Sequence, residues 1–411
     1  MKIVQINTFC GVGSVGRICV DLYDVLEREG HEPYIAIGRG KLPEHIRGFK
    51  NGNLWDFGWH VMKNFFQGKA GFGSAKTTKK LIAWLETVRP DVIHLHNIHG
   101  FYLQTELLFD YLKKSGAAVI WTLHDCWTFT GHCAYFDYIG CDKWQRGCEK
   151  CKVHASAYPY ALFKDNTKWN YAAKKEAYTG VPNLTVVTPS RWLADMVKKS
   201  YLKDYPVEVI PNGINLDVFC PEETVEASQT ESVHGGEKAS GQYNILGVAN
   251  IWEERKGLVY FEQLAEKMPE GYVIRLVGVN DRQEKQLRKK FPDGKIVPIK
   301  RTKNVQQLAQ LYREADVYVN ATMEDNFPTT NLEALACGTP VVTFKTGGSP
   351  ESLDEKCGIV VPKGDVDALL MAVRKVCEEK PFARKDCRQK ALAYGRNERY
   401  MQYISLYESV L

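Results

Sequence analysis

Residues 315–344, ADVYVNATMEDNFPTTNLEALACGTPVVTF, contain two short apolar runs separated by helix-forming residues. The runs at 315–321 and 339–344 are rich in valine and threonine, as strands are, and Gly338 marks the end of the helix between them. A strand, a helix and a second strand in this order predict a βαβ unit, whose two strands are parallel. This unit decides the fold, because its pattern repeats along the chain.

The alternation recurs with helical patterns such as those at 15–30 and 80–90. One set of predicted strands lies at 2–6, 32–38, 91–96, 118–124 and 184–190. A second set starts with VEVIPNG and lies at 207–213, 243–250, 272–279, 295–299, 315–321, 339–344 and 358–362. The predicted fold class is therefore α/β, with two Rossmann-like doubly wound domains.

We expect the N-terminal domain to comprise residues 1–188 and the C-terminal domain residues 189–389. The polar segment 221–241 lacks aromatic residues and cannot bury enough apolar surface to become ordered, so it is predicted to be a mobile loop of the second domain. The stretch 390–411 is a helical pattern that we expect to cross back to the N-terminal domain. Its aromatic residues are Tyr394, Tyr400, Tyr403 and Tyr407.

The bulk composition is that of a globular protein. Of 411 residues, 44% are hydrophobic and 25% are charged, and the length favours two cores. The formal net charge of +5 is too small to indicate a nucleic-acid partner. The N-terminal sequence lacks a secretion-signal pattern, and no apolar run has the length of a membrane span. These features predict a cytoplasmic protein whose 12 cysteines are mostly reduced.

The start of the predicted helix near residue 329 is a candidate ligand site, because ligands of doubly wound domains bind where the strands end. The backbone N–H groups around Phe327, Thr329 and Thr330, together with the helix dipole, are suited to a phosphate. Glu333, one turn further, can accept hydrogen bonds from sugar hydroxyls, so the two features together indicate a nucleotide. The alternative is a capping box of Thr330 and Glu333, worth about 1 kcal/mol to the helix and without a ligand.

Asp325 and Glu333, followed by ALACGTPVV, resemble the EX7E segment of the family 4 glycosyltransferases. Other motifs agree in order: GVGSVGR at 11–17, HLHN at 94–97, TLHD at 122–125, TPSRW at 188–192, IPNGIN at 210–215, ERKG at 254–257 and TGGSPE at 346–351. The resemblance covers nearly the whole chain. It implies a retaining, nucleotide-sugar-dependent enzyme with the GT-B fold, in which two domains face a cleft.

The resemblance also implies residue roles in the second domain. Glu333 would hold the ribose of the donor nucleotide, and Asp325, where the family usually has Glu, would contact the hydroxyls of the donor sugar. Lys256 would neutralise the departing diphosphate, where charge develops, so that catalysis needs no metal. The family's arginine six residues earlier is replaced by Asn250, and Arg255 is the candidate substitute. Without the resemblance, Arg255 and Lys256 would be interpreted as solvated residues at a helix start.

Gly13 and Ser14 lie in a glycine-rich loop after the first predicted strand. In a glycosyltransferase this loop lets the backbone approach the donor diphosphate, because glycine has no Cβ. The same G-x-G-x-x-G pattern, with Arg39 and Lys41 after the second strand, also fits an NADP-dependent oxidoreductase. The sequence further leaves open a GT-B nucleotide-sugar epimerase and a binding module without catalysis.

His124 follows the apolar strand AVIWTL and is expected at its carboxyl end. The resemblance implies that it contacts the donor sugar or the acceptor. The sequence leaves open whether it acts as a general base or only positions the substrate, because in retaining transfer the leaving phosphate can take the proton of the acceptor. His94 and His96 are expected to serve packing and hydrogen bonding.

Four cysteines, Cys133, Cys141, Cys148 and Cys151, lie in one predicted loop after His124. Four thiolates in a segment too small to have its own core favour a structural zinc site. Free thiols, a redox pair at Cys148 and Cys151, and an iron–sulfur cluster are the competing interpretations.

Residues 54–66, LWDFGWHVMKNFF, are rich in aromatic side chains and have Lys63 and Lys69 nearby. Core packing is the favoured interpretation, and peripheral contact with the inner face of the cytoplasmic membrane is the alternative. The predicted function is transfer of a sugar from a nucleotide-diphosphate sugar to a glycan or lipid-linked glycan, in the synthesis of bacterial capsule, exopolysaccharide or lipopolysaccharide.

Overall fold

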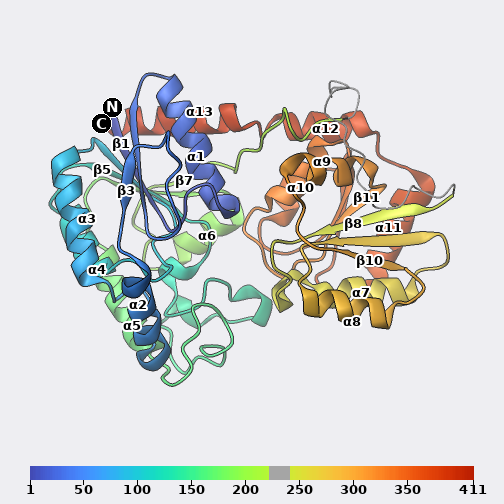
Figure 1. Ribbon diagram of the computed structural model, residues 1–411, viewed down its shortest axis with the longest axis horizontal. Coiled ribbons are helices and arrows are strands. Elements are labelled where there is room, and N and C mark those ends of the chain that lie inside the picture. Colours follow the sequence, from blue (N-terminus) through green and yellow to red (C-terminus); the bar gives the residue numbers. More distant parts are fainter. Residues whose placement is uncertain (222–240) are drawn as a thin grey trace. The chain divides into compact units, whose positions relative to one another are not determined.

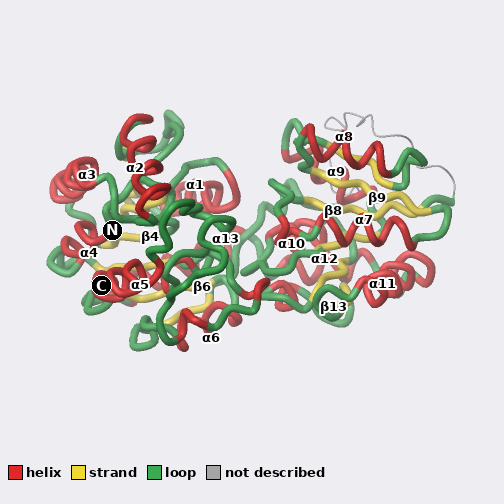
Figure 2. Tube along the Cα trace, turned by 90° about the horizontal axis from the view of Figure 1, so that it is seen from below, coloured by secondary structure: helices red, strands yellow, loops and turns green. Residues whose placement is uncertain are grey.

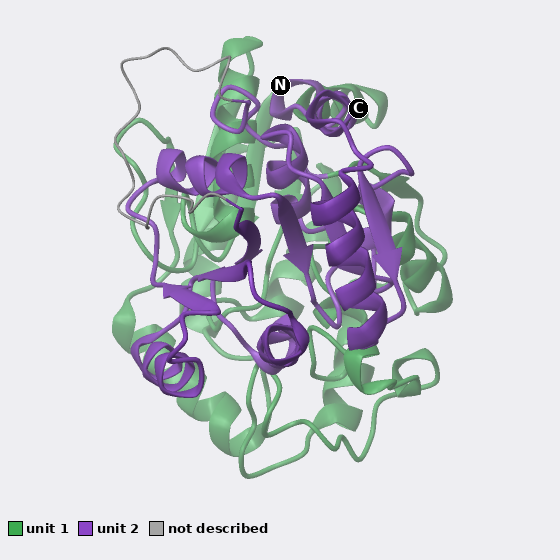
Figure 3. Cartoon of the chain, turned by 90° about the vertical axis from the view of Figure 1, so that its right-hand side faces the viewer, with its two compact units in different colours: residues 1–211, 399–411 green, residues 212–398 purple. Residues whose placement is uncertain are grey.

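The computed structural model describes residues 1–221 and 241–411. They form two compact units, residues 1–211 with 399–411 and residues 212–398 (Figure 3). The mobile loop predicted at 221–241 lies, apart from its two end residues, outside the described residues.

The first unit is built on a parallel sheet, which has seven strands within the described residues, in the order β3-β2-β1-β4-β5-β6-β7 (Figure 1). The strands are β1 (Lys2–Asn7), β2 (Glu32–Ile37), β3 (Gly48–Lys50), β4 (Val92–Leu95), β5 (Ala118–Thr122), β6 (Leu184–Thr188) and β7 (Val207–Val209). The α-helices are α1 (Gly13–Arg28), α2 (Leu54–Gln67), α3 (Ala75–Val88), α4 (Thr105–Leu112), α5 (Thr167–Tyr178), α6 (Arg191–Lys199) and, from the end of the chain, α13 (Arg396–Ser409). Three short 3-10 helices lie between β5 and α5: η1 (Trp127–Phe129), η2 (Asp137–Ile139) and η3 (Lys143–Gln145).

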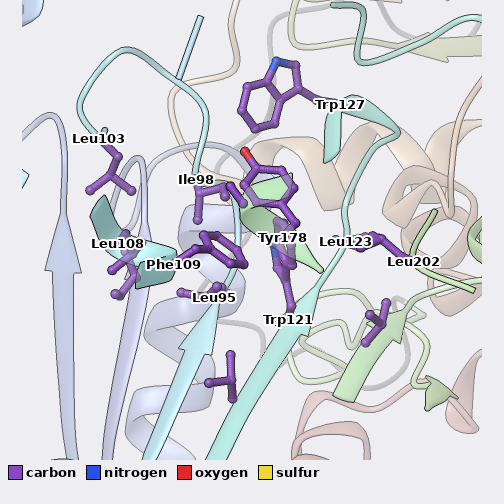
Figure 4. Packing of buried hydrophobic residues seen from close by; sticks show 14 of the residues in the cluster. Leu95, Ile98, Leu103, Leu108, Phe109, Trp121, Leu123, Trp127, Tyr178 and Leu202 are labelled. Atoms are coloured by element: carbon purple, nitrogen blue, oxygen red, sulfur yellow. The ribbon is translucent and has the colours of Figure 1, made fainter. Parts of the chain in front are cut away.

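Helices cover both faces of this sheet, which is why its central strands are apolar runs without alternation. Residues of α3, α4 and α5 form the larger core with β4 and β5. Phe109, Trp121 and Tyr178 lie at its centre, with the rings of Phe109 and Tyr178 4.4 Å apart (Figure 4). On the opposite face α1 and α13 pack together against β1 and β5.

The second unit is built on a parallel sheet of six strands within the described residues, in the order β10-β9-β8-β11-β12-β13. The strands are β8 (Tyr243–Val248), β9 (Tyr272–Val277), β10 (Ile296–Ile299), β11 (Val317–Asn320), β12 (Val341–Phe344) and β13 (Gly358–Val361). The α-helices are α7 (Leu258–Lys267), α8 (Asp281–Lys290), α9 (Val305–Glu314), α10 (Thr329–Ala336), α11 (Val366–Glu379) and α12 (Arg384–Leu392). The 3-10 helices are η6 (Glu254–Lys256) and η7 (Ser349–Ser352).

This sheet also has helices on both faces, as Figures 1 and 2 show. Residues of α7, α8 and α11 form the core on one face, and residues of α9, α10 and α12 form the core on the other. Two parallel sheets, each enclosed between helices, confirm the predicted α/β fold class with two doubly wound domains.

The division between the units differs from the sequence-based boundary. The compact units divide after Pro211, whereas the sequence placed the boundary after residue 188. The segment VEV at 207–209, predicted to start the second domain, is β7 and pairs with β6 at the edge of the first sheet. Because β7 and α6 are built onto this sheet, the first unit extends to the end of β7.

The predicted C-terminal helix is two helices. α12 packs on α10 in the second unit, and Tyr394, after α12, packs against Phe327 with ring centroids 5.7 Å apart. α13 belongs mostly to the first unit, where Tyr400, Tyr403 and Tyr407 are buried in the core beside α1. The expectation that the C-terminal helix returns to the first domain is confirmed for α13.

The aromatic face of α2 is exposed, contrary to the favoured prediction of core packing. Trp55 is 85% exposed and Trp59 74%, and Leu54, Met62 and Phe66 are also exposed. The residues of α2 that are buried are the polar His60 and Asn64. In the described part of the chain, no helix has both the length and the apolar character needed to span a membrane.

Candidate active site

The loops that leave the centre of the second sheet carry the predicted donor site. The chain runs from β8 toward one edge of the sheet and from β11 toward the other, so these two strands flank the topological switch point. Ligands of doubly wound domains bind beside the carboxyl ends of the strands at such a point. The loops that start there are 249–257 after β8, 321–328 after β11 and 345–348 after β12.

Lys256 and Asp325 meet where the first two of these loops approach each other. Lys256 Nζ donates to Asp325 Oδ2 over 2.5 Å, and Arg255 Nη1 lies 3.9 Å from the same oxygen. Burial alone would raise the pKa of Asp325, but the two cations outweigh burial and hold the pKa below its usual value. Asp325 is therefore an ionised carboxylate at neutral pH.

Arg255 is held by its own loop contacts. Its Nη1 donates to the carbonyl oxygen of Glu324 over 2.7 Å, and its backbone oxygen accepts from the backbone N–H of Met323 over 2.8 Å. The Arg255 side chain is only 12% exposed and that of Lys256 27%. The alternative of a solvated helix start is therefore wrong for these two residues.

Two glycines allow the loops to approach this closely. Gly257 has φ +76°, and a Cβ built on it would lie 2.1 Å from the carbonyl oxygen of Ala321. Gly347 has φ +53°, and its Cβ would lie 1.8 Å from the carbonyl oxygen of Asp325. The backbone N–H of Gly348 donates to that same oxygen over 3.1 Å. The ERKG loop thus approaches the backbone of Ala321, and the TGGSPE loop that of Asp325, at distances that only glycine permits.

Glu333 lies in α10 and is 6% exposed. Its Oε2 accepts a hydrogen bond from Tyr312 Oη of α9 over 3.1 Å. The N-cap of α10 is Pro328, which makes no side-chain capping bond, so the alternative of a Thr330–Glu333 capping box is wrong. The helix start carries no side-chain acceptor from its own N-cap residue, as an anion site requires.

A buried network holds the start of α10 in place. Asn331 Oδ1 accepts from Asn320 Nδ2 over 2.8 Å, and Asn331 Nδ2 donates to Ser349 Oγ and Ser352 Oγ, both over 3.0 Å. These contacts tie the end of β11 and the start of η7 to α10. Phe327, just before the helix, is buried, whereas Thr329 and Thr330 are partly exposed.

Asn250, at the family's arginine position, is exposed and accepts a hydrogen bond from Arg301 Nη2 over 3.0 Å. Arg301 follows β10, and the sequence did not suggest it because it lies in none of the motifs. A guanidinium therefore lies beside residue 250 although the chain has asparagine there. Tyr312 was also missed, since a tyrosine inside a helix has the sequence pattern of a core residue.

Gly13 and Ser14 follow β1, which flanks the switch point of the first sheet between β1 and β4. Gly13 and Ser14 are exposed at the start of α1, after β1, and Gly13 has φ +70°. The exposed backbone at this turn is accessible to a ligand of the first unit. Arg39 is stacked over the rings of Phe57 and Phe9, at 4.1 and 4.9 Å from their centroids.

His124 follows β5 and is partly buried. Its Nε2 makes a hydrogen bond with Nδ1 of His96 over 3.1 Å. Burial lowers the pKa of His124 to about 4, and the neighbouring Asp125 carboxylate, which acts in the opposite direction, does not offset this. Asp125 makes a hydrogen bond with His99 Nε2 over 2.9 Å and accepts from the backbone N–H of Trp127 over the same distance, so it orders the loop after β5.

The predicted zinc site is not formed. Within the described residues, no group of three or more His, Cys, Asp or Glu side chains is arranged to hold a metal ion. Cys133 is buried, and Cys141 and Cys148 pack against the first core. The prediction was wrong because it did not foresee that the loop packs into the larger core of the first unit.

Aromatic residues order this loop instead. The ring centroid of Trp144 lies 5.2 Å from that of Phe129 and 5.0 Å from that of Phe136, and all three residues are buried. The buried Lys174 donates from Nζ to the carbonyl oxygens of Trp127 and Thr130 over 2.8 and 3.2 Å. These contacts stabilise the loop, which is the role that we predicted for a structural zinc ion.

Comparison with known families decides the assignment. The model described as Glycosyltransferase Family 4 matches residues 15–218, and the model described as Glycosyl transferases group 1 matches residues 242–379. The chain belongs to the family 4 glycosyltransferases. The two matches include His124 in the first unit and Lys256, Asp325 and Glu333 in the second, so the recognition of the family from its motifs is confirmed.

Similar proteins span the whole chain. WcaC of Escherichia coli K12, named as a colanic acid biosynthesis glycosyl transferase, is 22% identical over 436 aligned residues, which cover 100% of each chain. Sucrose-phosphate synthase of Thermosynechococcus elongatus has a TM-score of 0.73 at 17% identity, covering 100% of this chain and 98% of that one. HepE of Anabaena, in complex with UDP, has a TM-score of 0.67 at 14% identity over 100% of both chains. These structural similarities establish the GT-B fold of this glycosyltransferase, and none of the comparisons favours an oxidoreductase.

Proposed function

We propose that this family 4 glycosyltransferase is a retaining enzyme that moves a sugar from a nucleotide-diphosphate sugar to a glycan or lipid-linked glycan acceptor. The observation that carries the proposal is the pairing of Lys256 with Asp325 at the switch point of the second sheet. A cation and an ionised carboxylate side by side provide what the reaction needs, since the diphosphate gains negative charge while the sugar ring becomes electron-poor.

Each predicted donor residue has a role in this proposal. Lys256 and Arg255 neutralise the diphosphate, and the backbone N–H groups around Phe327, Thr329 and Thr330 bind its oxygens. Glu333 accepts hydrogen bonds from the ribose hydroxyls, and its bond from Tyr312 fixes the orientation of the carboxylate. Asn250 orients Arg301 toward the diphosphate. The exposed Gly13–Ser14 backbone of the first unit is a further candidate for binding phosphate oxygens.

Transfer breaks the bond between the anomeric carbon of the sugar and the β-phosphate oxygen, and the electron pair stays on the phosphate. The acceptor oxygen then bonds to the anomeric carbon on the same face, and its proton moves to the phosphate oxygen that has just left. Retention follows because the new bond forms on the face of the old one. Lys256 stabilises the leaving charge, so we propose that this catalysis is independent of metal ions.

The names of the relatives suggest the biological setting. WcaC is named for colanic acid biosynthesis, and HepE was crystallised with UDP. We propose that the chain acts in the synthesis of a bacterial surface polysaccharide such as capsule, exopolysaccharide or lipopolysaccharide, and that UDP-sugars are the donors to test first.

A ligand screen tests this function. The melting temperature is measured in the presence of UDP, GDP, ADP or NADP. It is expected to rise with one nucleoside diphosphate and not with NADP. The sugar nucleotides of the stabilising base then serve as substrates, with and without glycan acceptors, and NMR of the product reports its anomeric configuration. Turnover of the donor to an isomer without any acceptor would identify an epimerase, and an inverted anomeric centre would overturn the retaining mechanism.

We propose further that the enzyme binds the inner face of the cytoplasmic membrane through α2. Trp55, Trp59, Met62 and Phe66 follow one side of the helix and are exposed, and Phe66 stacks on the exposed Phe163 with ring centroids 4.9 Å apart. An apolar face with lysines near it, such as those at 63, 69 and 164, is suited to an anionic lipid surface.

Replacing both tryptophans tests the membrane contact. The variant Trp55→Ser/Trp59→Ser is expected to lower binding to phosphatidylglycerol vesicles by on the order of tenfold or more, because two interfacial anchors are lost. Co-sedimentation with vesicles measures the effect. Met371→Ser on α11, which removes an exposed apolar side chain of the second unit, is the matched control. Equal vesicle binding by the wild type and the double variant would contradict the proposal.

A further inference from the structure

An arginine of the first unit lies where three neighbouring strands of the sheet end. β2, β1 and β4 are adjacent, so the loops that follow them lie side by side. The backbone N–H of Arg39, after β2, donates to the carbonyl oxygen of Thr8, after β1, over 2.8 Å. Thr8 Oγ1 donates to the carbonyl oxygen of His99, after β4, over 2.6 Å. The backbone of Arg39 is therefore fixed by both neighbouring loops.

The side chain of Arg39 is held by two aromatic rings. Its guanidinium carbon lies 4.1 Å from the ring centroid of Phe57 and 4.9 Å from that of Phe9. Such contacts attract the cation and set the plane of the guanidinium. An arginine that is held in this way loses little further freedom when it binds a ligand.

The stacked guanidinium has no anionic partner within residues 1–221 and 241–411. No side chain among them forms an ion pair or a hydrogen bond with it, and Arg39 is partly exposed. The Asp125 carboxylate, after β5, is already occupied, because its two oxygens bond to His99 Nε2 and to the backbone N–H of Trp127, both over 2.9 Å. Stacking covers the faces of the guanidinium, so its N–H groups, which lie in the plane, remain free to donate.

Two further aromatic residues lie beside this arginine. The ring centroid of Phe101 is 6.2 Å from that of Phe57 and 6.1 Å from that of Tyr158. Burial raises the pKa of Tyr158, and the charge of Arg39 acts against this rise, as it does when the two groups are near each other. Phe101 has φ +66°, which a bulky side chain rarely adopts. Such backbone strain is often found at binding sites, where the surrounding structure enforces it.

The helix α2 connects Arg39 to the exposed aromatic face described above. Phe57 and Asn64 lie on the inner side of α2, opposite that face. Asn64 Nδ2 donates to the carbonyl oxygen of Pro159 over 2.6 Å, so the helix is tied to the loop that carries Tyr158. A helix with its side chains is about 10 Å across. The Arg39 guanidinium is thus about one helix diameter from the side chains proposed to enter the lipid surface.

We infer that Arg39 binds the phosphate that joins the lipid to the glycan in a lipid-linked acceptor. A guanidinium binds phosphate oxygens through two parallel N–H···O hydrogen bonds. Such a phosphate lies at the surface of the bilayer, which is the depth at which α2 is proposed to bind. The inference rests on the proposed transfer to a lipid-linked glycan. It makes Arg39 a residue that selects acceptors carrying a phosphate over neutral ones.

Calorimetric titration of the full chain with n-decyl phosphate tests this inference. The neutral n-decyl maltoside, which has the same alkyl chain, is titrated in parallel. Arg39→Gln is expected to weaken the binding of decyl phosphate about tenfold, because a charge-assisted hydrogen-bond pair is lost, and to leave that of decyl maltoside unchanged. Arg39→Lys keeps the charge but not the planar fork, so its loss should be smaller, about threefold.

Lys50→Gln is the matched control. Lys50 is exposed at the end of β3, beside Ile37 in the register, and its variant should bind decyl phosphate within about twofold of the wild type. Unchanged binding in Arg39→Gln, or equal losses for both ligands or in both glutamine variants, would overturn the inference. Inorganic phosphate that binds as tightly as decyl phosphate, with the same dependence on Arg39, would identify a site for free phosphate and would also overturn it. Neither donor nor transfer is needed, so the result is independent of the test of the transferase.

Discussion

Lys256→Gln is expected to lower kcat by on the order of 10²–10³-fold, while the KM for the donor changes less. In the proposed mechanism the cation lies where the leaving diphosphate gains charge, so its contribution is expected to be larger in the transition state than in the bound substrate. The substitution also removes the 2.5 Å partner of Asp325, and the pKa of that carboxyl should rise because one of the two cations that lower it is lost. Initial rates with the nucleotide sugar that the ligand screen identifies measure the effect.

Lys267→Gln is the matched control for this prediction. Lys267 lies on α7 of the same unit, is 46% exposed, and pairs with the exposed Asp367. Its replacement removes the same charge from the unit but not from the switch point, so kcat should stay within about twofold of the wild type. Similar losses in both variants would mean that net charge, and not the position of Lys256, governs the rate.

The strands at the sheet centres could be predicted because parallel strands covered on both faces are continuous apolar runs. Edge strands have no such pattern. β3 is the short segment Gly48–Lys50 and β7 is the segment VEV, and each has two exposed residues. A short run of this kind can extend either neighbouring sheet, and only the pairing of β7 with β6 decides which. The domain boundary depends on that pairing.

The proposed donor residues could be predicted only from family motifs. Lys256 and Asp325 are 69 residues apart, and no local pattern indicates that their side chains meet. Contacts without a motif were not predicted: Tyr312 reaches Glu333 from a different helix, and Arg301 reaches Asn250 from the loop after β10. Such pairs arise from the packing of elements, which periodicity does not encode.

The zinc site and the buried aromatic face of α2 were mispredicted for one physical reason. Cysteine spacing indicates which thiols are near in sequence, but not whether aromatic residues such as Trp144 already stabilise the loop. In the same way, an amphipathic helix such as α2 has an apolar face whether that face covers a core or remains exposed. What lies opposite the side chains decides both cases, and that is a property of the tertiary structure.

Gly347→Ala is expected to damage both the fold of the second unit and its proposed donor site. Its Cβ would lie 1.8 Å from the carbonyl oxygen of Asp325, and backbone cannot yield as a flexible side chain does. We expect the melting temperature to fall by about 5 °C or more and kcat/KM to fall on the order of 100-fold, since Asp325 must move away from its position beside Lys256. Calorimetry and initial rates measure the two effects.

Gly294→Ala is the control that separates the effect of a positive φ from the effect of a steric clash. Gly294 also has a positive φ, +79°, but a Cβ there meets nothing within 4 Å. Gly294 lies in the turn between α8 and β10. Its alanine variant is therefore expected to lose only about 1 kcal/mol of unfolding free energy, from the strain of the positive φ, and to keep the kinetics of the wild type. If Gly347→Ala lost no more activity than Gly294→Ala, catalysis would not depend on the position of the Asp325 carbonyl against the TGGSPE loop. The contact between these loops would then serve the stability of the second unit without setting the geometry of transfer.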